Sequence, residues 1–165
     1  METAEYTGTQ RKKKVRAADR EVERQSIQTV EQVIVAGTDM NEHMYFEMQP
    51  IGIGKLDLGW TIGENNKQLG EITIQLYDFF SGKSAVCGSF ELQEDFQRTD
   101  KHYGTRIWQE RVEKRLIALG YNRIKIEHVM EDARSFWEKL GYQPVDDTPY
   151  SPLTKELQPV VSKDK

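Results

Sequence analysis

The sequence has a single cysteine, Cys87, and no apolar run approaching the roughly 18 residues of a membrane-spanning helix. One cysteine excludes an intrachain disulfide and a thiolate-based metal site, and its simplest role is a small apolar residue in a strand. The chain has three histidines, His43, His102 and His128, and their scattered positions lack metal-ligand spacing. These cysteine and histidine positions predict no bound metal. Because the N-terminus is polar and basic rather than apolar, we also expect a soluble cytoplasmic protein without a membrane segment.

The chain also lacks a large excess of charge of one sign, because it has 23 Lys and Arg and 27 Asp and Glu, which gives a net charge of -4. This balance argues against a dedicated nucleic-acid binder. Residues 1–24 nevertheless hold seven basic and five acidic residues, so the body of the chain is more acidic than the whole. We expect residues 1–16 to form a flexible basic tail, and an arm that touches phosphate, nucleic acid or an acidic partner is the alternative.

The length of 165 residues suits one domain, here residues 17–165. In residues 17–54 the apolar spacing predicts a helical region, with an amphipathic helix over 17–36 that includes Val22, Val30 and Ile34. Gly37 supplies its end. The following stretch, with Met40, Met44 and Met48, predicts a short second helix and then a loop.

Residues 55–92 alternate between apolar and polar positions and predict three antiparallel strands over 55–62, 69–80 and 84–92. Residues 93–145 predict a charged loop, a long amphipathic helix over 104–119, a strand over 122–129, a short helix from 132 and a strand over 142–145. Residues 146–165 hold a last strand, 153–157, and a tail. Because a helix joins the strands 84–92 and 122–129, they should lie parallel in an otherwise antiparallel sheet, which makes the fold class mixed α+β with helices on both faces.

The loop before the long helix is the most informative segment for function. A loop that runs into a helix N-terminus offers unpaired amides and the positive end of the helix dipole, which suit a diphosphate. Arg98, Lys101 and Arg106 would add positive charge, and Gly104 lets the backbone approach closely. A phosphate-bearing ligand is therefore predicted here, although Asp100 carries the opposite sign.

Two stretches resemble the GCN5-related N-acetyltransferases: the Gly-Thr-Arg-Ile start of the long helix at Gly104 and the string Ala-Arg-Ser-Phe-Trp-Glu-Lys-Leu-Gly-Tyr from Ala133 to Tyr142. The resemblance covers residues 85–145. It implies a fold in which two splayed parallel strands hold the pantetheine of acetyl-coenzyme A and the loop before the long helix holds its pyrophosphate. By this resemblance the coenzyme-binding residues are Phe90, Leu92, Arg98, Lys101, His102, Tyr103, Gly104, Thr105, Arg106, Ala133, Phe136 and Trp137.

The resemblance implies an acetyl-coenzyme A-dependent N-acetyltransferase, in which a primary amine attacks the thioester directly in a ternary complex. Two positions depart from the family pattern. His102 stands where the loop has its first glycine, and Trp137 replaces a tyrosine that often protonates the leaving thiolate. An indole nitrogen is not a usable acid at neutral pH. The alternative is therefore a non-catalytic coenzyme A-binding or partner-binding module of the same fold.

Three residues are candidates for moving the protons of the reaction. Glu91 and Glu71 lie on the predicted splayed strand and on its antiparallel neighbour, where either carboxylate could take a proton from an amine through water. His128, near the end of the second splayed strand, could titrate near neutral pH. A solvated or structural side chain is the alternative for each. The acidic body suits a cationic amine acceptor, and homodimer formation stays open.

Overall fold

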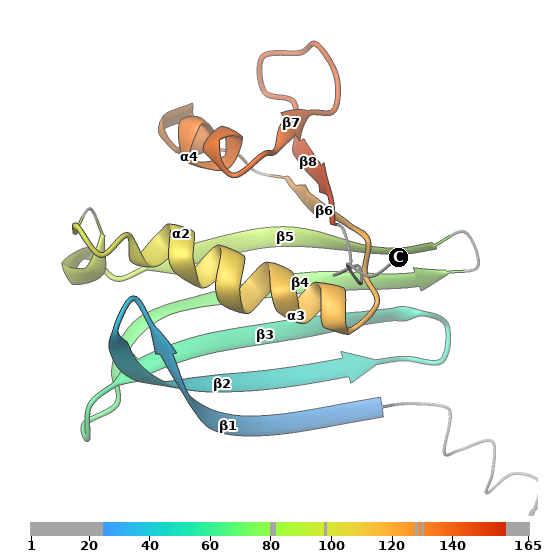
Figure 1. The fold of residues 1–165 in the computed structure, drawn as a ribbon. Helices are drawn as coiled ribbons and strands as arrows, with labels where there is room; N and C mark the ends of the chain where they lie inside the picture. Colours follow the sequence, from blue (N-terminus) through green and yellow to red (C-terminus); the bar gives the residue numbers. More distant parts are fainter. Residues whose placement is uncertain (1–24, 80–81, 98, 128, 130, 158–165) are drawn as a thin grey trace, which may run out of the picture.

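The computed structural model describes residues 25–79, 82–97, 99–127, 129 and 131–157. These residues form one mixed sheet with strands in the order β1-β2-β3-β4-β5-β6-β8-β7 (Figure 1). The strands are β1 (Gln25–Val35), β2 (Thr38–Met48), β3 (Ile53–Ile62), β4 (Lys67–Phe79), β5 (Gly82–Leu92), β6 (Arg123–Ile126), β7 (Gln143–Pro144) and β8 (Leu153–Glu156). Strands β5 and β6 are parallel, while the other neighbouring pairs are antiparallel. The predicted α+β class and its parallel pair are therefore confirmed.

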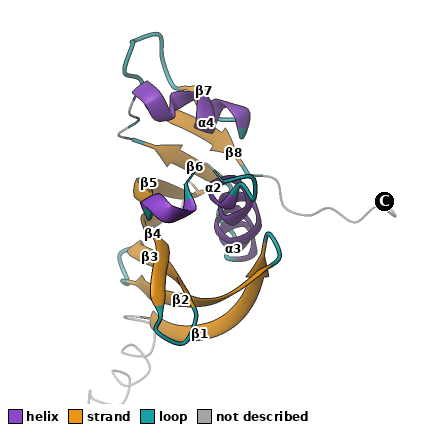
Figure 2. Cartoon of the chain, turned by 90° about the vertical axis from the view of Figure 1, so that its left-hand side faces the viewer, coloured by secondary structure: helices purple, strands orange, loops and turns teal. Residues whose placement is uncertain are grey.

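One long helix covers one face of the sheet (Figure 1). It begins as α2 (Tyr103–Ile107), continues as a π-helical segment (Trp108–Glu113) and ends as α3 (Lys114–Ala118). Two short 3-10 helices (Glu94–Phe96 and Glu131–Ala133) and α4 (Arg134–Lys139) complete the described elements. The sheet curves around the long helix (Figure 2), so we call this side the buried face and the opposite side the open face.

The predicted helical region over residues 17–54 is wrong where the structure describes it. Residues 25–48 form β1 and β2, a hairpin closed at Ala36 and Gly37, both of which have positive φ. In β2 the side chains of alternate residues, from Met40 to Met48, point to the buried face. The four-residue spacing of the methionines therefore reflects two steps of a strand rather than one turn of a helix. The predicted basic tail, residues 1–16, lies outside the described residues.

The later elements follow the prediction closely. The three predicted strands over 55–92 are β3, β4 and β5, and the helix predicted over 104–119 lies at 103–118. Between the sheet and the helix lies a core of large apolar side chains. Its fully buried members include Trp60, Trp108, Leu56, Leu58, Ile72, Ile74, Leu76, Ile107, Leu116 and Ile124. This core fixes the helix against the centre of the sheet and so places the helix N-terminus beside the end of β5.

Candidate active site

The parallel strands β5 and β6 separate within the sheet. They pair from Ala85–Ile124 to Cys87–Ile126, and the amide of Glu127 donates a last bond of 3.4 Å to the carbonyl of Cys87. Beyond this point β5 runs on to Leu92 with no partner on its β6 side among the described residues. The register of β5 on β4 also changes here, because Thr73 faces Ser89 while Ile74 faces Cys87. Gly88 is thus the extra residue of a β-bulge, which bends the strand where the separation begins.

A cavity of about 330 Å³ occupies the gap between the two strands. It is lined by Cys87, Gly88, Ser89, Phe90, Glu91, Ile126, Ala133, Phe136 and Trp137. Four residues that the resemblance assigned to the coenzyme therefore lie together at this site: Phe90, Ala133, Phe136 and Trp137. Glu91, a candidate for proton transfer, lies with them. An apolar slot with a backbone rim suits an extended chain carrying amide groups.

Aromatic side chains form the wall of this cavity nearest α4. Trp137 is 6% exposed and meets Trp108 edge to face, with ring centroids 4.6 Å apart. It also packs on Phe136 at 4.8 Å and on Tyr142 at 5.6 Å. Such tilted ring pairs add to the burial energy and hold the rings in fixed orientations. Trp137 is therefore a rigid part of the wall.

A buried carboxylate supports this aromatic wall from behind. Glu113 accepts hydrogen bonds from the Tyr142 hydroxyl at 2.6 Å and from the Trp108 indole at 3.0 Å, and Lys155 approaches its carboxylate at 3.2 Å. Burial, followed by the charge of Glu113, raises the pKa of Tyr142, which keeps the phenol protonated. Sequence reasoning missed this group, because Glu113 lies within an amphipathic helix where a charged residue predicts a solvent-facing position.

The thiol of Cys87 lies at the base of the cavity. Its side chain is 2% exposed, and burial raises the pKa of the thiol to about 12, so it stays neutral at physiological pH. The structural role expected for this cysteine fits that position. Among the described residues no group of His, Cys, Asp and Glu is arranged to hold a metal ion.

A second hollow, of about 240 Å³, lies at the N-terminus of the long helix and shares Phe136 with the cavity. Besides Phe136, its lining includes five residues that the resemblance assigns to the coenzyme: Leu92, His102, Tyr103, Gly104 and Thr105. The first hydrogen bond of the helix runs from the amide of Arg106 to the carbonyl of His102. The amides of residues 103–105 precede it, so they are free of helical partners and point toward this end.

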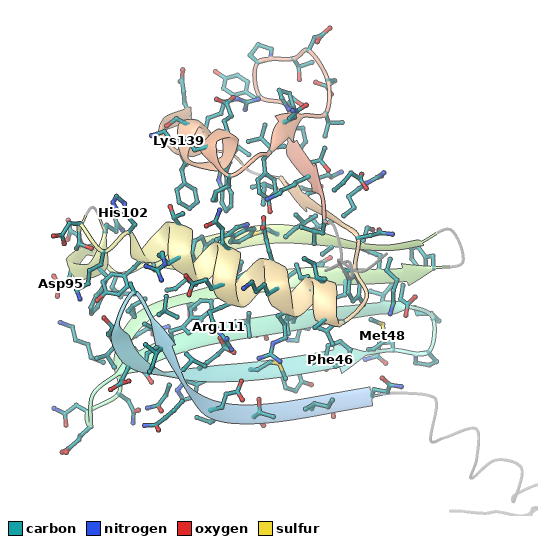
Figure 3. All side chains as sticks on the ribbon, in the orientation of Figure 1. Phe46, Met48, Asp95, His102, Arg111 and Lys139 are labelled. Carbon is teal, nitrogen blue, oxygen red and sulfur yellow. The ribbon has the colours of Figure 1, made fainter. Side chains whose placement is uncertain are left out.

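His102 adopts a left-handed backbone conformation, with φ 52° and ψ 51°, at the position before α2. Glycine occupies this conformation without steric cost, whereas a residue with a Cβ is strained there. The family motif has glycine at this position, so His102 keeps the backbone conformation that a glycine would adopt without steric cost. Figure 3 shows His102 at the N-terminal tip of the long helix, and its side chain is exposed.

The charged residues of the loop are distributed unevenly. Lys101 is exposed and lies beside the hollow in the turn before α2. Arg106 instead forms an ion pair with Glu110 at 2.6 Å, one turn further along the helix. Arg98 lies outside the described residues. Tyr103 is 7% exposed and its hydroxyl bonds to Thr38 at 2.8 Å, so it anchors the helix start to the β1–β2 hairpin.

Gly104 is closely packed against two apolar side chains. A Cβ at this position would meet the Leu92 side chain at 3.3 Å and the Phe136 ring at 3.5 Å. Phe136 lines both the cavity and the hollow, and Leu92 lines the hollow beside it. Together the cavity and the hollow form one surface that runs from the strand gap to the helix N-terminus.

The two candidate carboxylates lie side by side. Glu71 on β4 and Glu91 on β5 are directly paired across the strands, and both are exposed. Glu91 also lines the strand gap, whereas Glu71 lines a hollow of about 330 Å³ on the open face together with His43, Asp57 and Gly59. His128 lies outside the described residues. Sequence reasoning missed the contribution of His43, because the residues of β2 were predicted to form a helix and a loop. It also missed Asp57, whose strand β3 was predicted but whose neighbours on β2 were not.

None of the helices in the described part of the chain combines the length and the hydropathy needed to cross a membrane. No family model and no curated protein sequence matches the chain. Solved structures do resemble it. Tetrahymena GCN5 superposes with a TM-score of 0.52 at 12% identity, over 65% of this chain and 71% of that chain.

Two further solved structures superpose less well. A tyrosine-to-phenylalanine variant of KacT gives a TM-score of 0.47 at 16% identity, over 62% of this chain and 71% of its own. A tyrosine-to-phenylalanine variant of the AtaT toxin, bound to the C-terminus of the antitoxin AtaR and to acetyl-CoA, gives a TM-score of 0.44 at 16% identity. The superposition covers 70% of this chain and 68% of that chain. On the separated parallel strands and the likeness to Tetrahymena GCN5, this chain has the GCN5-related N-acetyltransferase fold.

Proposed function

We propose that this protein is an acetyl-coenzyme A-dependent N-acetyltransferase that acts on a cationic primary amine. The observation that carries the proposal is the continuous surface from the gap between β5 and β6 to the free amides at the start of the long helix. The two parts of this surface differ in chemistry, as the pantetheine and the pyrophosphate of the coenzyme do. The gap is apolar with a backbone rim, while the helix N-terminus carries the positive end of a dipole.

The residues at hand fit the coenzyme in size and polarity. Ala133, Phe136 and Trp137 would flank the pantetheine chain, and the unpaired edge of β5 beyond Gly88 would hydrogen-bond its amides. The amides of residues 103–105 would receive the pyrophosphate, with Lys101 as the nearby cation. Arg106 would contribute only by leaving Glu110, which makes it a weaker candidate than its position in the motif suggests.

The amine would reach the strand gap from the open face. The long helix covers the buried face (Figure 2), and the hollow with Glu71 and Asp57 lies on the open face. Its carboxylates attract a protonated amine, in agreement with the acidic body of the chain. The two substrates would then meet at the gap from opposite sides of the sheet, which suits direct attack in a ternary complex.

The coenzyme supplies an acetyl thioester, whose carbonyl carbon gains a bond to the amine nitrogen and loses its bond to sulfur. Glu91 lines the gap and is our candidate for removing the proton of the ammonium, directly or through one water. Glu71, its direct neighbour, would hold the ammonium by charge. Backbone amides of β5 beyond the bulge would polarise the carbonyl, since fixed dipoles act strongly in a site that excludes water.

One observation favours a second candidate function, a coenzyme-binding or partner-binding module without catalysis. Among the described residues that line the gap, none apart from Glu91, the proposed base, is an acid suited to protonate the leaving thiolate. Trp137 carries an indole, and the pKa of Cys87 is about 12. If water protonates the leaving thiolate, the chain is an enzyme. If no group protonates the thiolate, the chain only binds its ligand.

Two measurements separate these functions. Acetyl-coenzyme A at a hundredfold excess over its dissociation constant should stabilise the fold by about 2.7 kcal/mol in thermal unfolding. Release of free thiol, followed over a panel of polyamines, aminoglycosides and lysine peptides, should then reveal an acceptor. Absence of stabilisation at millimolar coenzyme would overturn the enzyme and the coenzyme-binding module, and stabilisation without thiol release from any acceptor would favour the binding module.

A further inference from the structure

Gly59 forms the floor of the hollow of about 330 Å³ on the open face. It lies within β3, directly between His43 of β2 and Glu71 of β4 in the register of the sheet. Since residues paired in this way point to the same face, His43 and Glu71 stand on either side of a position that has no side chain. The hollow is therefore the space that a side chain at position 59 would fill.

The fold does not require glycine at this position. Gly59 is not among the residues with positive φ, and of the described atoms only the carbonyl oxygen of Gly70 would lie within 4 Å of a Cβ here, at 3.8 Å. That separation is an ordinary van der Waals contact. Glycine inside a strand weakens the strand and often marks a place where a ligand approaches the backbone closely. Because packing gives no reason for Gly59, we read the hollow as a binding site.

Asp57 indicates the charge of the ligand. It lines the hollow beside Gly59, and its Oδ1 atom is buried with no hydrogen-bond partner in the described part of the chain. Lys55 lies 3.7 Å from the other oxygen, Oδ2, which is too long for a hydrogen bond, and its ammonium group lies over the Tyr45 ring at 5.5 Å. A buried carboxylate oxygen without a donor is unfavourable, so a positively charged group with N–H bonds suits this place.

We propose that the hollow over Gly59 holds the second ammonium group of a linear diamine, whose first amino group is acetylated beside Glu91. The proposal rests on the acetyltransferase function and names the acceptor class. Glu71 pairs directly with Glu91 on one side and with Gly59 on the other, so it connects the strand gap to the hollow. The first ammonium group would lie between the two glutamates and the second at Asp57.

The spacing of the sheet sets the length of the diamine. Asp57 lies one strand from Glu71 and two strands from Glu91, displaced by two residues along the strands. With strands about 4.8 Å apart and two residues spanning about 6.8 Å, the point midway between the glutamates lies about 10 Å from Asp57, measured between Cα positions. An extended diamine of about eight carbons covers this distance, because each bond of a zigzag chain with C–C bonds near 1.5 Å advances it by roughly 1.25 Å.

Calorimetry on the full chain without coenzyme tests the hollow directly. The probes are the linear eight-carbon diamine and the eight-carbon amino alcohol, in which a hydroxyl replaces the second amine. We expect the diamine to bind at least about tenfold more tightly, since hydrogen bonds to charged groups are the stronger ones. Salt at about 0.15 M screens the general attraction between a dication and an acidic protein.

Asp57→Asn should remove the preference for the diamine, because it removes the charge that faces the second ammonium group. Glu64→Gln is the matched control, since it removes a carboxylate from the exposed β3–β4 turn, outside the hollow, and should keep the preference. Equal affinity of the natural chain for the two probes would overturn the proposal. An equal loss of preference in both variants would overturn it as well, because the selectivity would then follow net charge alone.

Gly59→Val fills the hollow and tests its role in turnover. Valine suits a strand better than glycine, so the melting temperature should not fall. In thiol release with acetyl-coenzyme A, the ratio of kcat/KM for the diamine to that for the amino alcohol should fall at least about tenfold. An unchanged ratio would refute the second-ammonium site and leave the acetyltransferase function in place. Thiol release from neither probe would count against the acetyltransferase function, and calorimetry would then decide the hollow by itself.

Discussion

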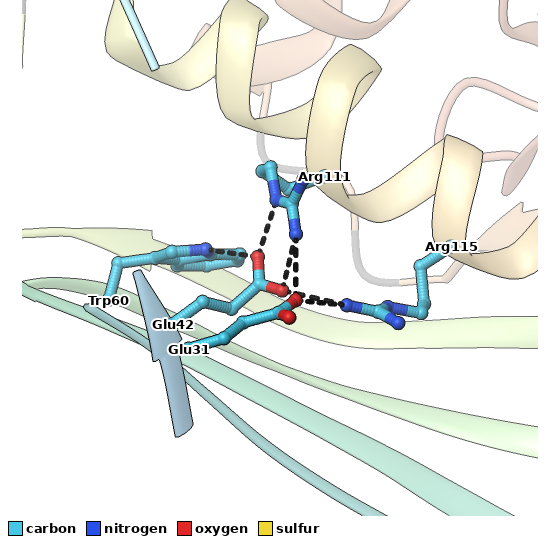
Figure 4. Close-up of polar contacts among 5 residues, drawn as sticks. All are labelled: Glu31, Glu42, Trp60, Arg111 and Arg115. Atoms are coloured by element: carbon cyan, nitrogen blue, oxygen red, sulfur yellow. Dashed lines mark hydrogen bonds and ion pairs between the residues drawn. The ribbon is translucent and has the colours of Figure 1, made fainter. Parts of the chain in front are cut away.

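Glu42 on β2 and Arg111 in the π-helical segment form a bidentate ion pair, with both N–O distances 2.7 Å (Figure 4). Glu42 is 1% exposed, and it also accepts hydrogen bonds from the indole of Trp60 at 2.9 Å and from Arg115 at 2.9 Å. Burial alone would raise the pKa of Glu42, but the bonds from Arg111 and Trp60 outweigh it and lower the pKa below its ordinary value. The pair ties the long helix to the second strand of the sheet.

Glu42→Gln should lower the free energy of unfolding by about 3 kcal/mol, because it leaves the Arg111 guanidinium without its counter-charge in a desolvated site. Since the carboxylate is ionised in the fold at a lower pH than in the unfolded chain, its contribution is complete above the unfolded pKa. It disappears as the pH falls through the folded pKa. Urea unfolding at neutral and acid pH should therefore show a difference between the two proteins that shrinks toward acid.

Glu31→Gln is the matched control for this prediction. Glu31 contacts the same two arginines, Arg115 at 3.3 Å and Arg111 at 3.6 Å, but its side chain is 55% exposed. Exposed ion pairs contribute at most about 1 kcal/mol. Equal losses in the two variants would contradict a special role for the buried carboxylate.

Glu42 also explains why the N-terminal half of the fold was predicted wrongly. In β2 the row that faces the core reads Met40, Glu42, Met44, Phe46 and Met48, with the first two buried and the others partly buried, so one carboxylate interrupts the apolar row. A charged residue in a core row predicts a solvent-facing position, so the alternation was missed. Only the arginines of a helix 69 residues later make that burial favourable, and no local pattern contains them.

Strand β1 was missed for a different reason. It is an edge strand with exposed side chains on both faces, so burial does not impose a two-residue period on its sequence. Its residues Val30 and Ile34, in a row with Val22 and Ser26, happen to recur at helical spacing. The later half was predictable because β4, β5 and the long helix each bury one face against a shared core, and because the loop and the Ala133–Tyr142 string carry a family pattern.

We expect Glu91→Gln to lower kcat about a hundredfold while the stabilisation by acetyl-coenzyme A is kept, because the amide cannot accept the ammonium proton. Glu71→Gln should instead raise KM for the amine, since this residue is proposed to hold the acceptor by charge. Glu64→Gln, in the exposed β3–β4 turn, is the control and should change neither constant. An unchanged rate in Glu91→Gln would remove this residue from the mechanism.

His102→Gly should relieve backbone strain at the start of the long helix. We expect the free energy of unfolding to rise by up to about 1 kcal/mol, because glycine adopts the left-handed conformation without a Cβ clash. If the loop holds the pyrophosphate, calorimetry should also detect tighter coenzyme binding. Asn66→Gly is the matched control, since Asn66 has φ 54° in the β3–β4 turn. It should leave coenzyme affinity unchanged, and equal affinity in all three proteins would argue against a pyrophosphate site at this loop.

Trp137→Tyr tests whether the missing acid limits the reaction. The tyrosine would place a phenolic O–H at the aromatic wall of the strand gap, where it could protonate the leaving thiolate. We expect thiol release to accelerate by about tenfold or more if this proton transfer is rate-limiting. Trp137→Phe is the control, because it makes nearly the same change in ring size without a hydroxyl. A gain in the Tyr variant alone identifies an enzyme whose chemistry is slowed by Trp137, whereas equal rates in both variants mean that the proton reaches sulfur from another source.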